Sequence, residues 1–158
     1  MTVLYLSPHC DDVVLSCAGR IAREAAAGER VVVATVFSAG SEDRASRAAA
    51  SVRAREDHAA LRSLGAESRH LGLADAPMRP GLAASYASLV LGPAPEDALL
   101  HTVSVVVEGL VAELAPRRVC LPLGVGGHIA PPAVFPTHAT PTGEVAFYGD
   151  RPYAPGPA

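Results

Sequence analysis

The stretch VLYLSPHCDD, residues 3–12, decides how the chain is organised. Its first four residues are an apolar run typical of a buried strand, and one imidazole (His9) and two carboxylates (Asp11 and Asp12) follow. Helix-like sequence begins at Asp12, so both carboxylates lie near a helix N-terminus, where negative charge is favoured. In open α/β sheets, ligands bind outside the carboxyl ends of the strands. The stretch therefore indicates either a ligand site or a helix capped by one of the aspartates.

Three side chains that follow this first strand favour metal chemistry. His9 and Asp12 offer one nitrogen and one oxygen ligand of the kind that zinc accepts. Asp11 then remains as a proton acceptor, a role that carboxylates take in general base catalysis. Cys10 is either a further ligand or a buried thiol. We expect it to be buried, because its side chain should point away from those of its neighbours.

Strand-like and helix-like patterns alternate along the rest of the chain. Apolar and β-branched residues fill 31–37, as expected for a strand buried on both faces of a parallel sheet. Shorter strands are predicted at 68–71 and 119–123, and apolar residues at helical spacing predict helices: 12–27, 44–64 and 97–115. This order predicts an α/β fold, a three-layer, doubly wound and mostly parallel sheet (Rossmann-like) with right-handed crossovers.

Charge and proline content describe two further segments. The charged residues of the second predicted helix are expected to form a solvated face, with pairs three and four residues apart: Arg53, Arg55, Glu56, Asp57 and Arg62. Residues 129–158 are expected to form an irregular, proline-rich tail, because repeated prolines exclude a regular helix. No linker divides the sequence, so residues 1–158 are expected to form a single domain.

Length and composition limit the class of protein. The 158 residues fit one globular domain, with 49% hydrophobic and 18% charged residues. A net charge of −3 gives no electrostatic case for nucleic acid or an anionic membrane. No segment approaches the roughly 20 apolar residues of a membrane span, and no signal peptide precedes the first strand. Three cysteines form neither a zinc-finger spacing nor an even disulfide set, so we expect reduced thiols in the cytoplasm.

Two more polar groups follow predicted strands. Asp75 comes after the strand at 68–71, and His128 follows the strand at 119–123 across the glycine-rich sequence GVGG. Glycines let the backbone pass close to a ligand without a Cβ in the way. GVGG does not match a phosphate loop, and no G-x-G-x-x-G follows the first strand, which argues against a nucleotide-binding domain.

Five motifs in this order resemble the PIG-L/LmbE-like family of zinc-dependent N-acetylglucosamine deacetylases and related amidases. They are SPHCDDVVLSCAG at 7–19, RAREDHAALRSLG at 53–65, LADAP at 73–77, PLGVGGH at 122–128 and FYGDRPYA at 147–154. Each motif alone is weak, but together they span nearly the whole chain. The resemblance implies a hydrolase that uses zinc, or another divalent metal, to activate water against an N-acetyl group. It implies no organic cofactor.

The resemblance also assigns roles to individual residues. It implies that His9 and Asp12 bind the metal, that Asp11 is the general base, and that His128 stabilises the oxyanion. The products would be acetate and a free amine.

Two further residues match positions where family members contact a sugar or polyol. These are Arg53 and Asp75, for which a helix salt bridge and a loop cap are the alternatives. The implied partner is a small acetamido-sugar-like substrate, with no nucleic acid and no membrane span. A homo-oligomer is compatible with this picture.

The sequence departs from the family after His128. The family continues with x-Asp-His, whose final histidine is the third metal ligand, whereas this chain has Ala130 and Pro131 at these two positions. The third ligand is then His128 itself or His138, or else the chain is a catalytically impaired member that acts as a binding or structural subunit. The family fold is also expected to be shortened at its C-terminus.

Overall fold

The computed structural model describes residues 1–40, 43–74, 98–123 and 143–149. Within these ranges the chain forms one five-stranded, all-parallel sheet in the order β3-β2-β1-β4-β5. Its strands are β1 (Thr2–His9), β2 (Arg30–Ala39), β3 (Glu67–Ala74), β4 (Arg118–Pro122) and β5 (Glu144–Tyr148). The described helices are α1 (Asp12–Ala26), α2 (Arg44–Ser63) and α4 (Ala98–Leu114). The predicted α/β fold is confirmed.

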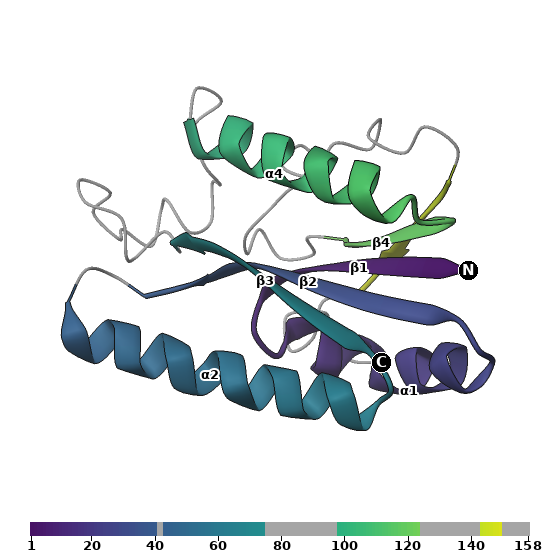
Figure 1. The fold of residues 1–158 in the computed structure, drawn as a ribbon, viewed down its shortest axis with the longest axis horizontal. Coiled ribbons are helices and arrows are strands. Elements are labelled where there is room, and N and C mark those ends of the chain that lie inside the picture. The colour runs from purple at the N-terminus through teal and green to yellow at the C-terminus, as the bar shows by residue number, and fades with distance from the viewer. Residues whose placement is uncertain (41–42, 75–97, 124–142, 150–158) are drawn as a thin grey trace, which may run out of the picture.

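Helices cover both faces of the sheet, with α1 and α2 on one face and α4 on the other (Figure 1). Successive side chains of a strand point to opposite faces. In β1, Val3 and Tyr5 pack with α1 and α2, while Leu4 and Leu6 pack with α4, and all four are fully buried. Two cores on one sheet explain why the central strands read as continuous apolar runs.

The central position of β1 follows from the route of the chain through the sheet. After β1, the chain adds β2 and β3 on one side and then returns to add β4 and β5 on the other. This reversal makes a topological switch point at the carboxyl end of β1, where open α/β sheets bind ligands. β1 ends at His9, whose Cα pairs with that of Phe37 in β2. The polar residues behind β1 therefore occupy the position at which this fold favours a ligand.

The segment expected to be an irregular tail contains a strand. β5 lies within residues 129–158, so the expectation is wrong for residues 144–148. β5 pairs with β4 in register along its full length, and the buried Tyr148 hydroxyl donates a hydrogen bond to the Leu6 carbonyl at 2.8 Å. Prolines exclude a helix around this segment, but they do not exclude a short extended run between them.

The cysteines match the expectation of reduced thiols. Cys10, Cys17 and Cys120 are buried and form no disulfide with one another, which confirms the expected burial of Cys10. Burial raises the pKa of the Cys120 thiol to about 11. None of the helices that the structure describes is long and apolar enough to span a membrane.

Candidate metal and catalytic site

The turn from β1 into α1 holds an uncommon backbone conformation. Asp11 has a φ of 92°, in the left-handed region that residues with side chains rarely adopt. The Ser7 hydroxyl lies under the turn, donating to the His9 carbonyl at 2.7 Å and accepting from the Val13 N–H at 3.3 Å. Asp11 occupies the N-cap position of α1, but its side chain makes no capping hydrogen bond. A capping role therefore does not explain its carboxylate.

His9 and Asp12 lie together at the start of α1. The Asp12 Oδ2 atom accepts a hydrogen bond from the His9 backbone N–H at 2.9 Å and lies 3.1 Å from His9 Nδ1. Two tetrahedral zinc ligands at bond lengths of about 2.0–2.1 Å are separated by roughly 3.3 Å. The His9 ring also packs against Phe37, with ring centroids 5.7 Å apart. The donor pair and its spacing fit a zinc ion, while metal binding itself stays a prediction.

Asp11 lies next to this pair on the wall of a small cavity of about 150 Å³. Desolvation and the charge of Asp12 raise the pKa of Asp11, whereas the charges of Arg53 and His9 act in the opposite direction. A carboxylate with a raised pKa is a stronger base than an ordinary aspartate, which suits a general base. The position and environment of Asp11 are therefore compatible with the predicted role.

Arg53 reaches the same place from α2. Its guanidinium donates a hydrogen bond to the Cys10 carbonyl oxygen at 3.3 Å. Arg53 lines the small cavity and also a larger one of about 420 Å³, whose wall includes His9 and Phe37. The structure thus puts this cation beside the predicted catalytic turn, as substrate binding requires, and its contact with a substrate stays a prediction.

Asp57 is a site residue that the sequence interpretation missed. It was expected on the solvated face of α2, but only 3% of its side chain is exposed, so that expectation is wrong for this residue. Its Oδ2 atom accepts from the His70 ring at 2.8 Å and the Thr35 hydroxyl at 3.3 Å, and its Oδ1 from the Asp11 N–H at 3.4 Å. One signal was available, because Leu61 follows at i+4 and marks the buried face of the helix.

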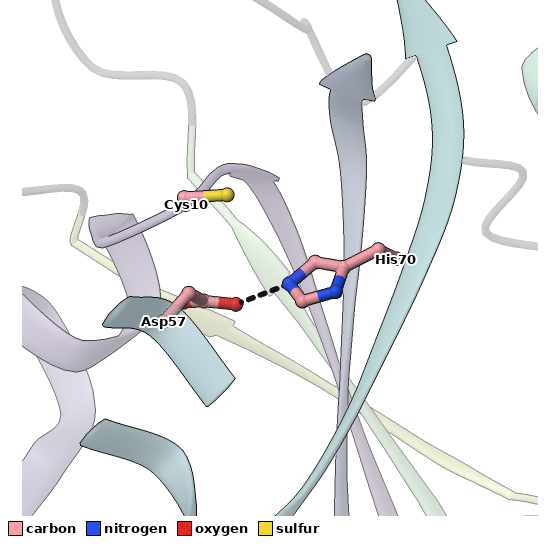
Figure 2. A group of neighbouring side chains, drawn as sticks. All are labelled: Cys10, Asp57 and His70. Atoms are coloured by element: carbon pink, nitrogen blue, oxygen red, sulfur yellow. Dashed lines mark hydrogen bonds and ion pairs between the residues drawn. The ribbon is translucent and has the colours of Figure 1, made fainter. Parts of the chain in front are cut away.

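Cys10, Asp57 and His70 converge from the β1–α1 turn, α2 and β3 (Figure 2). One ligand-type atom of each lies within 4.8 Å of those of the other two. Burial and the nearby Asp57 charge raise the pKa of the Cys10 thiol to about 11. Without a metal, Cys10 is therefore a thiol at neutral pH and a poor nucleophile.

Three of the predicted site residues, Asp75, His128 and His138, lie outside the described residues. The same holds for Ala130 and Pro131, which replace the family's Asp and His. The predicted roles of these positions stay predictions.

Comparison with known proteins shows that the chain is similar to deacetylases. The family model for GlcNAc-PI de-N-acetylase (PIG-L) matches residues 4–135. A crystal structure of the deacetylase from the teicoplanin biosynthesis pathway has a TM-score of 0.80 and 28% identity, covering 97% of this chain and 68% of that one. The zinc-inhibited form of teicoplanin deacetylase Orf2 has a TM-score of 0.81 and 26% identity, covering 97% and 69%.

A more distant structure shares the fold. The N,N'-diacetylchitobiose deacetylase from Pyrococcus horikoshii has a TM-score of 0.54 and 22% identity, covering 77% of this chain and 40% of that one. No curated protein sequence matches the chain.

Proposed function

Because the chain belongs to the PIG-L family, the GlcNAc-PI de-N-acetylases, we propose that it is a metal-dependent deacetylase that removes an N-acetyl group from an amino sugar. The observation that carries this proposal is the turn behind β1. There a nitrogen and an oxygen ligand lie 3.1 Å apart, with a second carboxylate of raised pKa beside them. This set contains a metal-binding pair and a base that is not needed as a ligand.

We assign His9 and Asp12 as metal ligands and Asp11 as the general base. A zinc ion held by this pair would supply Lewis acidity and lower the pKa of a bound water towards roughly 7. Asp11 accepts the proton that the attacking water loses and later passes it to the leaving amine. Arg53 orients the substrate from the cavity wall, where its guanidinium already lies against the Cys10 carbonyl. Acetate and a free amine leave.

The described residues supply two metal ligands in this assignment, and a third is still needed. Catalytic zinc sites keep three protein ligands and one exchangeable position. We propose His128, because in the sequence it follows β4, the strand next to β1, after the glycine-rich residues GVGG. His138 is the second candidate, ten residues further along. If His128 binds the metal, it does not act as the oxyanion donor, and a slow enzyme results.

The family supports an acetylated amino sugar as the substrate class, because its model is that of the GlcNAc-PI de-N-acetylases. Two of the similar structures are of a deacetylase from the teicoplanin pathway, one in a zinc-inhibited form. A cavity of about 420 Å³ beside His9 has room for one sugar unit. Asp75 is a further candidate for sugar contact, and the cytoplasmic location stays a prediction.

Replacement of Asp11 by Asn tests the proposal most directly. The amide keeps the shape of the side chain but cannot take a proton, so release of acetate from a panel of acetamido sugars should fall about 10²–10⁴-fold. Metal content, measured by mass spectrometry, should stay near that of the parent. Glu113→Gln, a carboxylate-to-amide change at an exposed position on α4, is the matched control.

Two other interpretations predict different results: a purely structural role for Asp11, and a chain that is a binding or structural subunit. Full activity in Asp11→Asn would show that Asp11 is only part of the turn. A parent chain that binds no metal and releases no acetate from any sugar would support a binding or structural subunit. The family and its deacetylase neighbours do not favour that alternative.

A further inference from the structure

We propose that Cys10, Asp57 and His70 form a second divalent-metal site of zinc type, separate from the His9–Asp12 pair. A thiolate, a carboxylate and an imidazole are three of the ligand types that zinc takes in proteins. Each residue offers one such atom, and the three atoms lie within 4.8 Å of one another. Ligands of one zinc ion are separated by roughly 3.3–3.8 Å at normal bond lengths, so small side-chain movements close the site.

The three ligands come from separate elements, and two of the three residues are buried. Cys10 is 5% exposed and the Asp57 side chain 3%, whereas the His70 side chain is 25% exposed and provides a route to solvent. Figure 2 shows the Cys10 sulfur and the Asp57–His70 hydrogen bond facing the same space. The adjoining cavity of about 150 Å³ is lined by Cys10 and Asp57 and has room for a water as the fourth ligand.

This site differs from the predicted catalytic pair in its ligands and its surroundings. His9 lines the larger cavity, whereas Asp57 lines the smaller one. The two sites adjoin, because His9 and Cys10 are consecutive residues and Cys10 lines both cavities, but no ligand atom is common to both. A thiolate ligand belongs to the second site alone among the groups assigned so far.

Metal binding at the second site requires a defined proton balance. The Cys10 thiol loses its proton to solvent and binds as the thiolate. The His70 ring, which now donates from Nε2 to Asp57 at 2.8 Å, carries its proton on Nδ1 instead and binds through Nε2. The Asp57 Oδ2 atom binds the metal, while Oδ1 keeps the hydrogen bond from the Asp11 N–H.

A metal ion held in this way would tie three elements together. It would link the turn that carries His9 and Asp12 to α2 and to β3. A ligand that binds only the folded state raises the unfolding temperature with its concentration. At a metal concentration 100-fold above Kd, the rise is about 5–10 °C for a chain of this size.

Cobalt titration of the metal-free chain tests the proposal, because Co²⁺ takes zinc sites and a thiolate bound to it gives a charge-transfer band in the near ultraviolet. The nitrogen and oxygen ligands of the His9–Asp12 pair do not produce that band. We expect the band in the parent and in Asp12→Ala, which removes the first site. It should disappear in Cys10→Ser and remain in Cys17→Ser, a matched change of another buried cysteine.

His70→Gln provides a second test that leaves the thiol in place. It should weaken cobalt binding, followed by the same band, at least about tenfold and reduce the rise in unfolding temperature. Circular dichroism of the metal-free variants checks their folding. Absence of the band in the parent, its persistence in Cys10→Ser, or unchanged affinity in His70→Gln would each overturn the proposal. None of these readouts depends on deacetylase activity, so either proposal can fail alone.

Discussion

Charged side chains gather at both ends of the parallel sheet, but their arrangement differs. At the amino end, opposite charges pair: Arg30–Glu67 between β2 and β3, Arg118–Glu144 between β4 and β5, and Arg117–Glu29 between the residues that precede β4 and β2, each at 2.8 Å. At the carboxyl end, Asp11 and Asp12 are adjacent, and the Asp57 carboxylate receives the N–H of Asp11. Exposed pairs of opposite charge contribute little to stability, whereas like charges held close together are common at functional sites.

The largest expected effect follows from removing a proposed metal ligand at the carboxyl end. Asp12→Ala deletes the carboxylate that lies 3.1 Å from His9 Nδ1 and that also receives the His9 N–H. Acetate release should fall to background, and metal bound at the first site should be lost. Bound metal is measured in variants that also carry Cys10→Ser, because this change removes the second site and leaves only the first. One metal ion per chain in the Asp12→Ala, Cys10→Ser double variant would contradict this assignment.

A smaller effect is expected from Asp57→Ala, which acts on stability. The substitution leaves the buried Thr35 hydroxyl and the partly buried Asp11 N–H without their carboxylate acceptor. We expect the free energy of unfolding to fall by about 2–4 kcal/mol, because each buried donor without a partner costs about 1–3 kcal/mol. Urea unfolding of the metal-free protein measures it.

Glu56→Ala, one residue earlier on the same helix, is the matched control for that experiment. Glu56 is exposed, so its replacement should change the free energy of unfolding by no more than about 0.5 kcal/mol. Equal effects of the two substitutions would show that Asp57 is a solvated residue after all.

The contrast between the two ends also explains what the sequence could predict. The first strand, the helix after it and the His9–Asp12 contact depend on residues that are close together in the sequence. They could therefore be predicted from the order of the residues from Val3 to Asp12. The position of β1 at the centre of the sheet depends on pairing with β4, more than a hundred residues away, and no local pattern carries that information. The fold class was therefore predictable, while the switch point needed the structure.

Asp57 and β5 show why other features were missed. An aspartate among arginines and glutamates is typical of a solvated face; Leu61 at i+4 could have indicated that Asp57 is buried, but its contact with His70 depends on how α2 packs on the sheet. β5 has five residues within a proline-rich segment, too few for a clear period. The remaining site residues, Asp75, His128 and His138, lie outside the described residues and stay predictions.

The smallest effect is expected at the amino end, where a charge pair between β2 and β3 can be removed. Arg30 forms two hydrogen bonds with Glu67, at 2.9 and 2.8 Å, but both side chains are about half exposed. Water and salt screen such a pair, and ordering two long side chains offsets much of its attraction. Arg30→Ala should therefore lower the unfolding temperature by no more than about 2 °C, and by less in 1 M salt.

Two double-mutant cycles compare the two ends of the sheet directly. One combines Arg30→Ala with Glu67→Ala, and the other combines Asp57→Ala with His70→Ala. The second cycle is measured on metal-free protein, so that metal binding does not contribute to the coupling. We expect the coupling between Asp57 and His70 to exceed that between Arg30 and Glu67, because the first pair is shielded from water. Equal couplings would remove the distinction between the two ends of the sheet.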